Sequence, residues 1–97
     1  MSNKKVVVEY GKKDIELSRV YPFGTVKNIG TDEEPKEVTV ITVNELNGKD
    51  EETIANNLDN KLEGFVTISV STGLTYDEVL MLASKDSIKT IGVLKDF

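Results

Sequence analysis

The sequence contains no cysteine and no histidine among its 97 residues. The lack of cysteine excludes disulfide bonds and thiolate chemistry, and it agrees with a reducing compartment. The lack of histidine removes the commonest general base and the commonest transition-metal ligand. A serine nucleophile would therefore need a lysine or another base beside it, and no local motif supplies one. The composition predicts a protein that is not an enzyme and that uses no cofactor.

Long apolar runs and clusters of basic residues are also missing. No apolar stretch approaches the roughly 20 residues that span a bilayer, and the start, Met-Ser-Asn-Lys-Lys, lacks the apolar stretch of a secretory signal. A net charge of −5 with scattered Lys and Arg argues against nucleic acid, whose phosphates require a clustered basic patch. We therefore expect a cytosolic protein that contacts neither membranes nor nucleic acids.

The acidic pairs and the glycines do not match a catalytic or ligand-binding motif. Asp32/Glu33 and Asp50/Glu51 lie in an expected loop and an expected helix start, contexts that favour full solvation, whereas acid–base catalysis requires a desolvated carboxylate. Residues 59–64 lack the alternating oxygen ligands of a calcium loop. The glycines follow neither the GxGxxG spacing nor that of a phosphate loop. No catalytic, metal-binding or cofactor-binding residue is predicted.

Three segments of residues 1–43 have the composition of β-strands. Lys5–Tyr10 contains three successive valines and Asp14–Val20 alternates polar with apolar residues, so these two segments predict a β-hairpin that turns at 11–13. Pro22 should end this pairing, because proline has no N–H to donate. Glu37–Val43 alternates hydroxyl-bearing with apolar residues and predicts a third strand.

Residues 44–97 carry the signals of short helices. Three acids at 50–52 mark an expected first helical turn, where the helix dipole favours negative charge, and apolar residues follow at helical spacing over 54–65. Residues 66–70 are ambiguous, because their alternation of valine and isoleucine with hydroxyls favours a strand. Continuing the apolar stripe favours instead a helix that ends at Gly73. The local pattern alone does not decide between the two.

Residues 72–97 predict two short capped helices. Thr75 and Glu78 have the spacing of a capping box, which places a helix start directly after Thr75. Ser84, with an acid two residues later, predicts a second helix from the next residue onward. The apolar residues of this second helix share one face, which either packs on the domain or binds another protein. They are Ile88, Ile91, Val93, Leu94 and Phe97.

Taken together, these segments predict one α+β domain over residues 1–97. Its β-rich half, 1–43, holds an N-terminal antiparallel β-hairpin plus a third strand, and its helical half, 44–97, is a bundle of three to four short helices. Apolar residues make up 38% of the chain and aromatic residues 6%, so we expect a small hydrophobic core and marginal stability.

Three short motifs follow one another along residues 38–97. They are Val-Asn-Glu-Leu-Asn-Gly-Lys-Asp-Glu-Glu at 43–52, Thr-Gly-Leu-Thr at 72–75, and a last helix with Asp86, Ile88 and Phe97. This order resembles the tail assembly chaperones of tailed bacteriophages, in which a short β-rich start precedes a helical body. The resemblance favours helix over strand for residues 61–72.

The resemblance implies a small non-enzymatic phage or prophage protein in the cytoplasm of the host bacterium. Its expected partner is the tape-measure protein, which it keeps soluble while tail-tube subunits polymerise around it, and the tail-tube protein is a further expected partner. The alternative is a structural component of a phage tail or baseplate that stays in the particle. Whether copies of the chain form a homo-oligomer, and whether frameshifting produces a longer form, stay open.

Such a chaperone needs apolar helix faces that it can offer to its partner, and a negative surface that keeps the complex dispersed. The expected contact residues lie in the last two helices, and the alternative for each of them is an ordinary place in the core. They are Val79, Leu82, Ile88, Ile91, Leu94 and Phe97.

Overall fold

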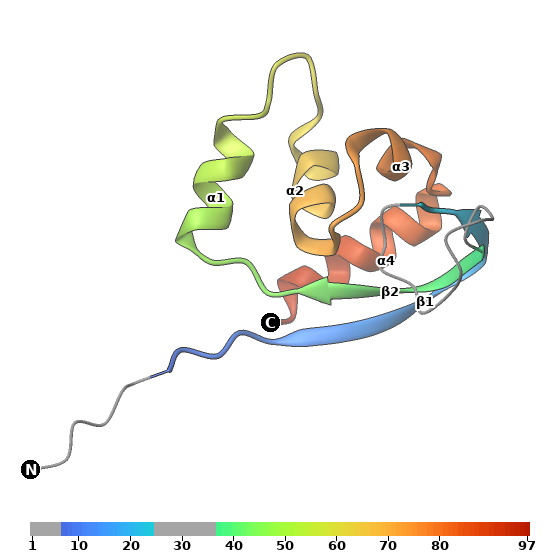
Figure 1. The fold of residues 1–97 in the computed structure, drawn as a ribbon, viewed down its shortest axis with the longest axis horizontal. Coiled ribbons are helices and arrows are strands. Elements are labelled where there is room, and N and C mark those ends of the chain that lie inside the picture. Colours follow the sequence, from blue (N-terminus) through green and yellow to red (C-terminus); the bar gives the residue numbers. More distant parts are fainter. Residues whose placement is uncertain (1–6, 25–36) are drawn as a thin grey trace, which may run out of the picture.

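The computed structural model describes residues 7–24 and 37–97 of the chain. These residues contain two strands and four helices, which are β1 (Lys12–Pro22), β2 (Glu37–Asn44), α1 (Gly48–Ala55), α2 (Glu63–Thr72), α3 (Tyr76–Met81) and α4 (Ser84–Lys95). The two strands form one antiparallel sheet, and the helices lie on one side of it (Figure 1). The expected α+β class is therefore confirmed. The acidic pair at 32–33 lies outside the described residues.

The strands pair differently from the prediction. β1 pairs with β2, so the predicted strands Asp14–Val20 and Glu37–Val43 are present but are each other's partners. The predicted strand Lys5–Tyr10 is wrong over its described residues 7–10, which belong to no strand, and the predicted turn at 11–13 is wrong because β1 already begins at Lys12. The expected hairpin plus third strand is thus, in the described part of the chain, a hairpin alone.

Gly11 explains why the chain does not turn there. Its carbonyl accepts a hydrogen bond from the Glu45 N–H at 2.8 Å, and its own N–H donates to the Glu45 carboxylate at 2.7 Å. The first of these bonds continues the β1–β2 ladder beyond the end of β2, and the second holds Gly11 beside Glu45 through the glutamate side chain. The backbone therefore stays extended where the sequence pattern predicted a reversal.

The register between β1 and β2 breaks between Glu16 and Tyr21, where β1 has an irregular bulge. Ile15 before the break, Leu17 within it and Tyr21 after it are all buried in the core, although residues 18–20 between them are exposed. β1 ends at Pro22, as the missing N–H of proline predicts.

The apolar stripe over 54–65 does not form one helix. α1 ends at Ala55, and the connection to α2 contains Asn60 in the left-handed region, with φ 55°. Asparagine and aspartate compete with the helix backbone for hydrogen bonds, and this connection is rich in both. Residues 66–70 are helical and belong to α2, as the resemblance favoured, and Gly73 ends the helix at φ 82°.

Two helix starts carry the capping box that closes the first turn. In α3, the Thr75 hydroxyl accepts from the Glu78 N–H and the Glu78 carboxylate accepts from the Thr75 N–H, as predicted. Asn47 and Asp50 form the same arrangement at α1. At α4 the N-cap is Ala83 with no side-chain cap, so the prediction that Ser84 caps this helix is wrong.

One hydrophobic core joins the strands to the helices. From the β-rich half it takes Ile15, Leu17, Tyr21, Phe23, Val38, Ile41 and Val43, and from the helical half Ile68, Leu74, Val79 and Leu82. The rings of Tyr21 and Phe23 stack within it at 4.9 Å. No helix in the described residues is long and apolar enough to span a membrane.

Candidate functional site

The six expected contact residues lie in different environments. Val79 and Leu82 are buried in the core, so they are not available to a partner. Ile91 and Leu94 are half-buried against the same core. Ile88 is 71% exposed and Phe97 is 42% exposed. The expected surface on the last two helices is therefore reduced to part of α4.

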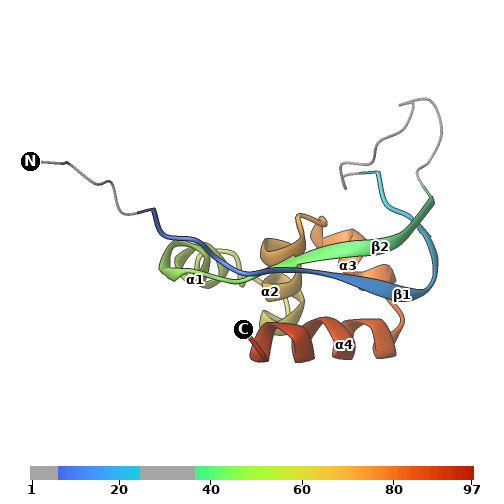
Figure 2. The same cartoon turned by 90° about the horizontal axis from the view of Figure 1, so that it is seen from below.

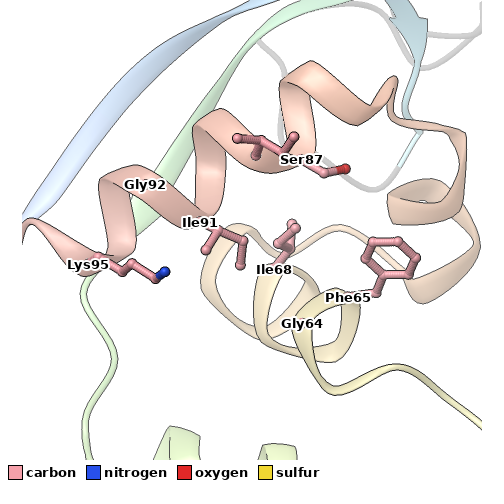
Figure 3. A pocket seen from close by; sticks show the side chains of 8 residues that line it. Gly64, Phe65, Ile68, Ser87, Ile91, Gly92 and Lys95 are labelled. Atoms are coloured by element: carbon pink, nitrogen blue, oxygen red, sulfur yellow. The ribbon is translucent and has the colours of Figure 1, made fainter.

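Two of these residues, Ile88 and Ile91, line a groove between α2 and α4 with a volume of about 440 Å³. Figure 3 shows Phe65 and Ile68 of α2 on one side of this groove and Ile91 of α4 on the other. We call it the α2–α4 groove. Its lining residues are Gly64, Phe65, Ile68, Ser87, Ile88, Ile91, Gly92 and Lys95.

Two of the residues that line the α2–α4 groove, Gly64 and Gly92, have no side chain. A Cβ atom added to Gly64 or to Gly92 would meet no other heavy atom within 4 Å. Backbone is therefore exposed to the groove at these points, and an approaching chain can come closer than it could against a larger residue. Of the described residues that line the groove, Lys95 alone is charged. The site is suited to apolar side chains.

Phe97 has a different role from that of the groove residues. Its ring packs on the backbone of Gly11, where an added Cβ would lie only 2.8 Å from the ring atom Cδ1. Glycine is required at this close approach, since a side chain there would displace the ring. Phe97 therefore attaches the end of α4 to the start of β1.

A buried polar cluster anchors the beginning of α4 to β1. The Asp86 carboxylate accepts hydrogen bonds from the Ser18 N–H at 2.9 Å, from the Ser18 hydroxyl at 2.8 Å and from the Tyr21 hydroxyl at 2.6 Å. The Tyr21 oxygen in turn accepts from the Ala83 N–H at 2.8 Å. The cluster thus ties the start of α4 to β1, and within it Tyr21 satisfies the N–H of the N-cap residue Ala83.

The hydrogen bonds of this cluster set the charge states of its members. Burial by itself raises the pKa of Asp86, but the donors Tyr21 and Ser18, helped by the charge of Arg19, lower that pKa below its ordinary value of 3.8. Burial raises the pKa of Tyr21 above 10.0, and its hydrogen bond to Asp86 raises it further. At neutral pH, Asp86 is therefore an anion and Tyr21 a neutral donor.

Sequence reasoning found the α4 side of the groove but missed the α2 side. Phe65 belonged to an apolar stripe that the pattern had singled out, so a signal for it existed. Gly64 carried no such signal, because only the packing of α2 against α4 shows that its backbone faces an open surface. No group of three or more His, Cys, Asp or Glu in the described residues is arranged to hold a metal ion.

Comparisons of the chain with protein-family models, with curated proteins and with solved structures found no match. The described residues thus form a small α+β domain with an apolar groove between α2 and α4.

Proposed function

We propose that the chain is a non-enzymatic assembly chaperone that holds an apolar helical segment of another polypeptide in the α2–α4 groove. The observation that carries this proposal is Ile88, an isoleucine that is 71% exposed at a groove with an apolar floor. Amphipathic helices bind in such grooves through apolar residues at helical spacing. A volume of about 440 Å³ accommodates more than one such side chain.

The resemblance to the tail assembly chaperones of tailed bacteriophages supplies the partner class. We assign the groove to the tape-measure protein in the cytoplasm of the host bacterium, with the tail-tube protein as a second partner. The net charge of −5 supports this role, because a negative surface keeps a complex with an apolar partner dispersed.

The decisive experiment co-expresses the chain with the tape-measure protein of the same phage or prophage and measures soluble, co-purified partner. Ile88→Ser should weaken capture about tenfold or more, because the variant loses the burial of one isoleucine side chain in the complex. Gly92→Leu should have the same effect by filling the groove. Leu80→Ser is the matched control, since Leu80 is an exposed apolar residue of α3 outside the groove.

Capture that is unchanged in both Ile88→Ser and Gly92→Leu would refute the groove as the binding site. Mass spectrometry of purified particles separates the proposal from its alternative. A chaperone is missing from the finished particle, whereas a structural component of the tail or baseplate is present in fixed copy number.

A further inference from the structure

The sheet of the described residues consists of β1 and β2 alone, so each strand has an outer edge without a strand neighbour. A free edge presents unpaired N–H and C=O groups to which another strand can add. Along a strand, the backbone groups of alternate residues point to the same edge. If the backbone hydrogen bonds of one residue are known, the alternation therefore shows which other residues direct their N–H and C=O groups to the outer edge.

The outer edge of β1 is covered by α4. The Ser18 N–H donates to Asp86 at 2.9 Å, and the Glu16 carbonyl accepts from the Lys89 ammonium at 2.8 Å. Figure 2 shows α4 running alongside β1, on the side away from β2. Two outward backbone groups of β1, the Ser18 N–H and the Glu16 carbonyl, thus already have hydrogen-bond partners on α4.

Among the described residues, the outer edge of β2 is hydrogen-bonded at one end, at Asn44. The Asn44 N–H donates to the Ser71 hydroxyl at 3.1 Å and the Asn44 carbonyl accepts from it at 2.7 Å, so Asn44 points outward. By alternation, Thr42 and Val40 also point outward. Within the described residues, no hydrogen bond from outside the β1–β2 pair reaches the backbone of Thr42 or Val40. The Val40 side chain is 46% exposed beside this open stretch.

The same chain carries a strand-forming segment without a partner. Val7 is 74% exposed and Val8 is 65% exposed, and Tyr10 follows them, yet residues 7–10 belong to no strand. Figure 1 shows this segment, in blue, leading away from the domain toward the N-terminus. We call residues 7–10 the N-terminal arm.

The arm does not lie along the edge of its own β2. Gly11 is bonded to Glu45 just beyond the end of β2, and residues 7–10 lead away from the sheet at that point (Figure 1). Among the described residues, the arm and the outer edge of β2 are therefore both without a strand partner.

We propose that the N-terminal arm of one copy adds as a third strand to the outer edge of β2, at Val40–Thr42, of a second copy. In the proposed dimer the exchange is reciprocal, with each copy donating one arm to the other and accepting one, which closes the contact around a two-fold axis. The pairing covers the valines of the arm and satisfies the outward backbone groups of β2. It also gives a strand-like sequence the strand partner that it lacks among the described residues of one molecule.

Val8→Pro tests this pairing in the full-length protein. The Val8 side chain is exposed and its backbone makes no hydrogen bond to another described residue, so the fold and its circular dichroism should not change. Proline has no N–H to donate and fixes φ at about −65°, whereas a paired strand has φ of about −120 to −140°, so the dimer dissociation constant measured by sedimentation should rise about tenfold or more. Val8→Thr is the control, because threonine keeps the N–H and the β-branch, and it should stay dimeric.

Hydrogen exchange locates the pairing. In the wild-type dimer the Val40 and Thr42 amides should be protected, and in Val8→Pro they should exchange freely. The Ile41 and Val43 amides point toward β1 and should be protected in both proteins. A wild-type chain that stays monomeric at millimolar concentration would overturn the proposal. So would a Val8→Pro dimer of unchanged affinity, or a dimer in which Val40 and Thr42 stay unprotected.

Discussion

At the scale of the residue, Asp86 shows which features the sequence pattern can predict and which it cannot. Its position in a helix could be predicted, whereas its hydrogen-bond partners could not. The sequence pattern places an acid in the first turn of a helix, and Asp86 lies there in α4. Its carboxylate, however, binds Ser18 and Tyr21, which precede it by 68 and 65 positions. A helix-start signal is local and can be read from neighbouring residues. Hydrogen bonds to a distant strand depend on tertiary packing, and the sequence pattern does not predict them.

Replacing Asp86 by asparagine should destabilise the fold at neutral pH. The amide keeps one oxygen acceptor but turns an NH₂ group toward the donors of Ser18 and Tyr21, so at least one hydrogen bond is lost. The expected cost is about 1–3 kcal/mol of unfolding free energy. Urea unfolding at pH 7, followed by circular dichroism, measures it. An equally stable variant would show that the cluster does not anchor α4.

The effect of this substitution should depend on pH in a defined direction. Folding lowers the pKa of Asp86 below 3.8, so its contribution to stability is present above that value and is lost as the pH falls through the folded pKa. The difference between wild type and Asp86→Asn should therefore be constant near pH 6 to 7, at about its neutral value, and shrink in acid. Folding raises the pKa of Tyr21 above 10.0, so its contribution is lost as the pH rises through that folded pKa. Unfolding curves measured from acid to alkali test both limits.

At the scale of the element, helix ends were more predictable than helix lengths. The capping box at Thr75 and the stop at Gly73 depend on a few adjacent residues, and both are present. The stripe over 54–65 had helical spacing throughout, yet α1 and α2 are separate helices. Spacing alone does not reflect the energetic cost of helix formation across the four Asn or Asp residues between 56 and 60, of which Asn60 adopts a positive φ.

Two glycine-to-alanine substitutions should have opposite effects on stability. Gly92 lies inside α4, where an added Cβ meets no heavy atom within 4 Å, so Gly92→Ala should stabilise the fold by roughly 0.5–1 kcal/mol. Gly73 has φ 82°, a conformation that strains alanine, so Gly73→Ala should cost roughly 1 kcal/mol or more. Thermal unfolding of both variants checks the signs. Two shifts of the same sign would contradict the assignment of these backbone positions.

At the scale of the whole molecule, the sequence predicted the fold class but not the pairing of its parts. Alternation over the strands and helical spacing over the second half are local properties, and they sufficed for an α+β domain. That Glu37–Val43 pairs with Asp14–Val20 rather than adding to an earlier hairpin depends on Gly11 and Glu45, which the pattern did not connect. For the same reason, only the α4 side of the α2–α4 groove was predicted. Each helix can be recognised from nearby residues, but the packing of α2 against α4 depends on residues far apart in the sequence.

The shared core predicts that the two halves of the chain unfold together. Ile68 of α2 is fully buried in the cluster that also contains Ile15 and Ile41 of the strands. Ile68→Ala should therefore cost about 2–5 kcal/mol, a large part of the roughly 5–15 kcal/mol of a typical domain. Ile88→Ala is the same chemical change at a residue that is 71% exposed, and it should cost less than about 0.5 kcal/mol. Amide signals of β1 and α4, followed by NMR through a urea titration, should disappear at one common midpoint in each variant, because removing core contacts weakens strands and helices at once. Strand amides that keep their native shifts after the helices have unfolded would show instead that the β-rich half is stable by itself.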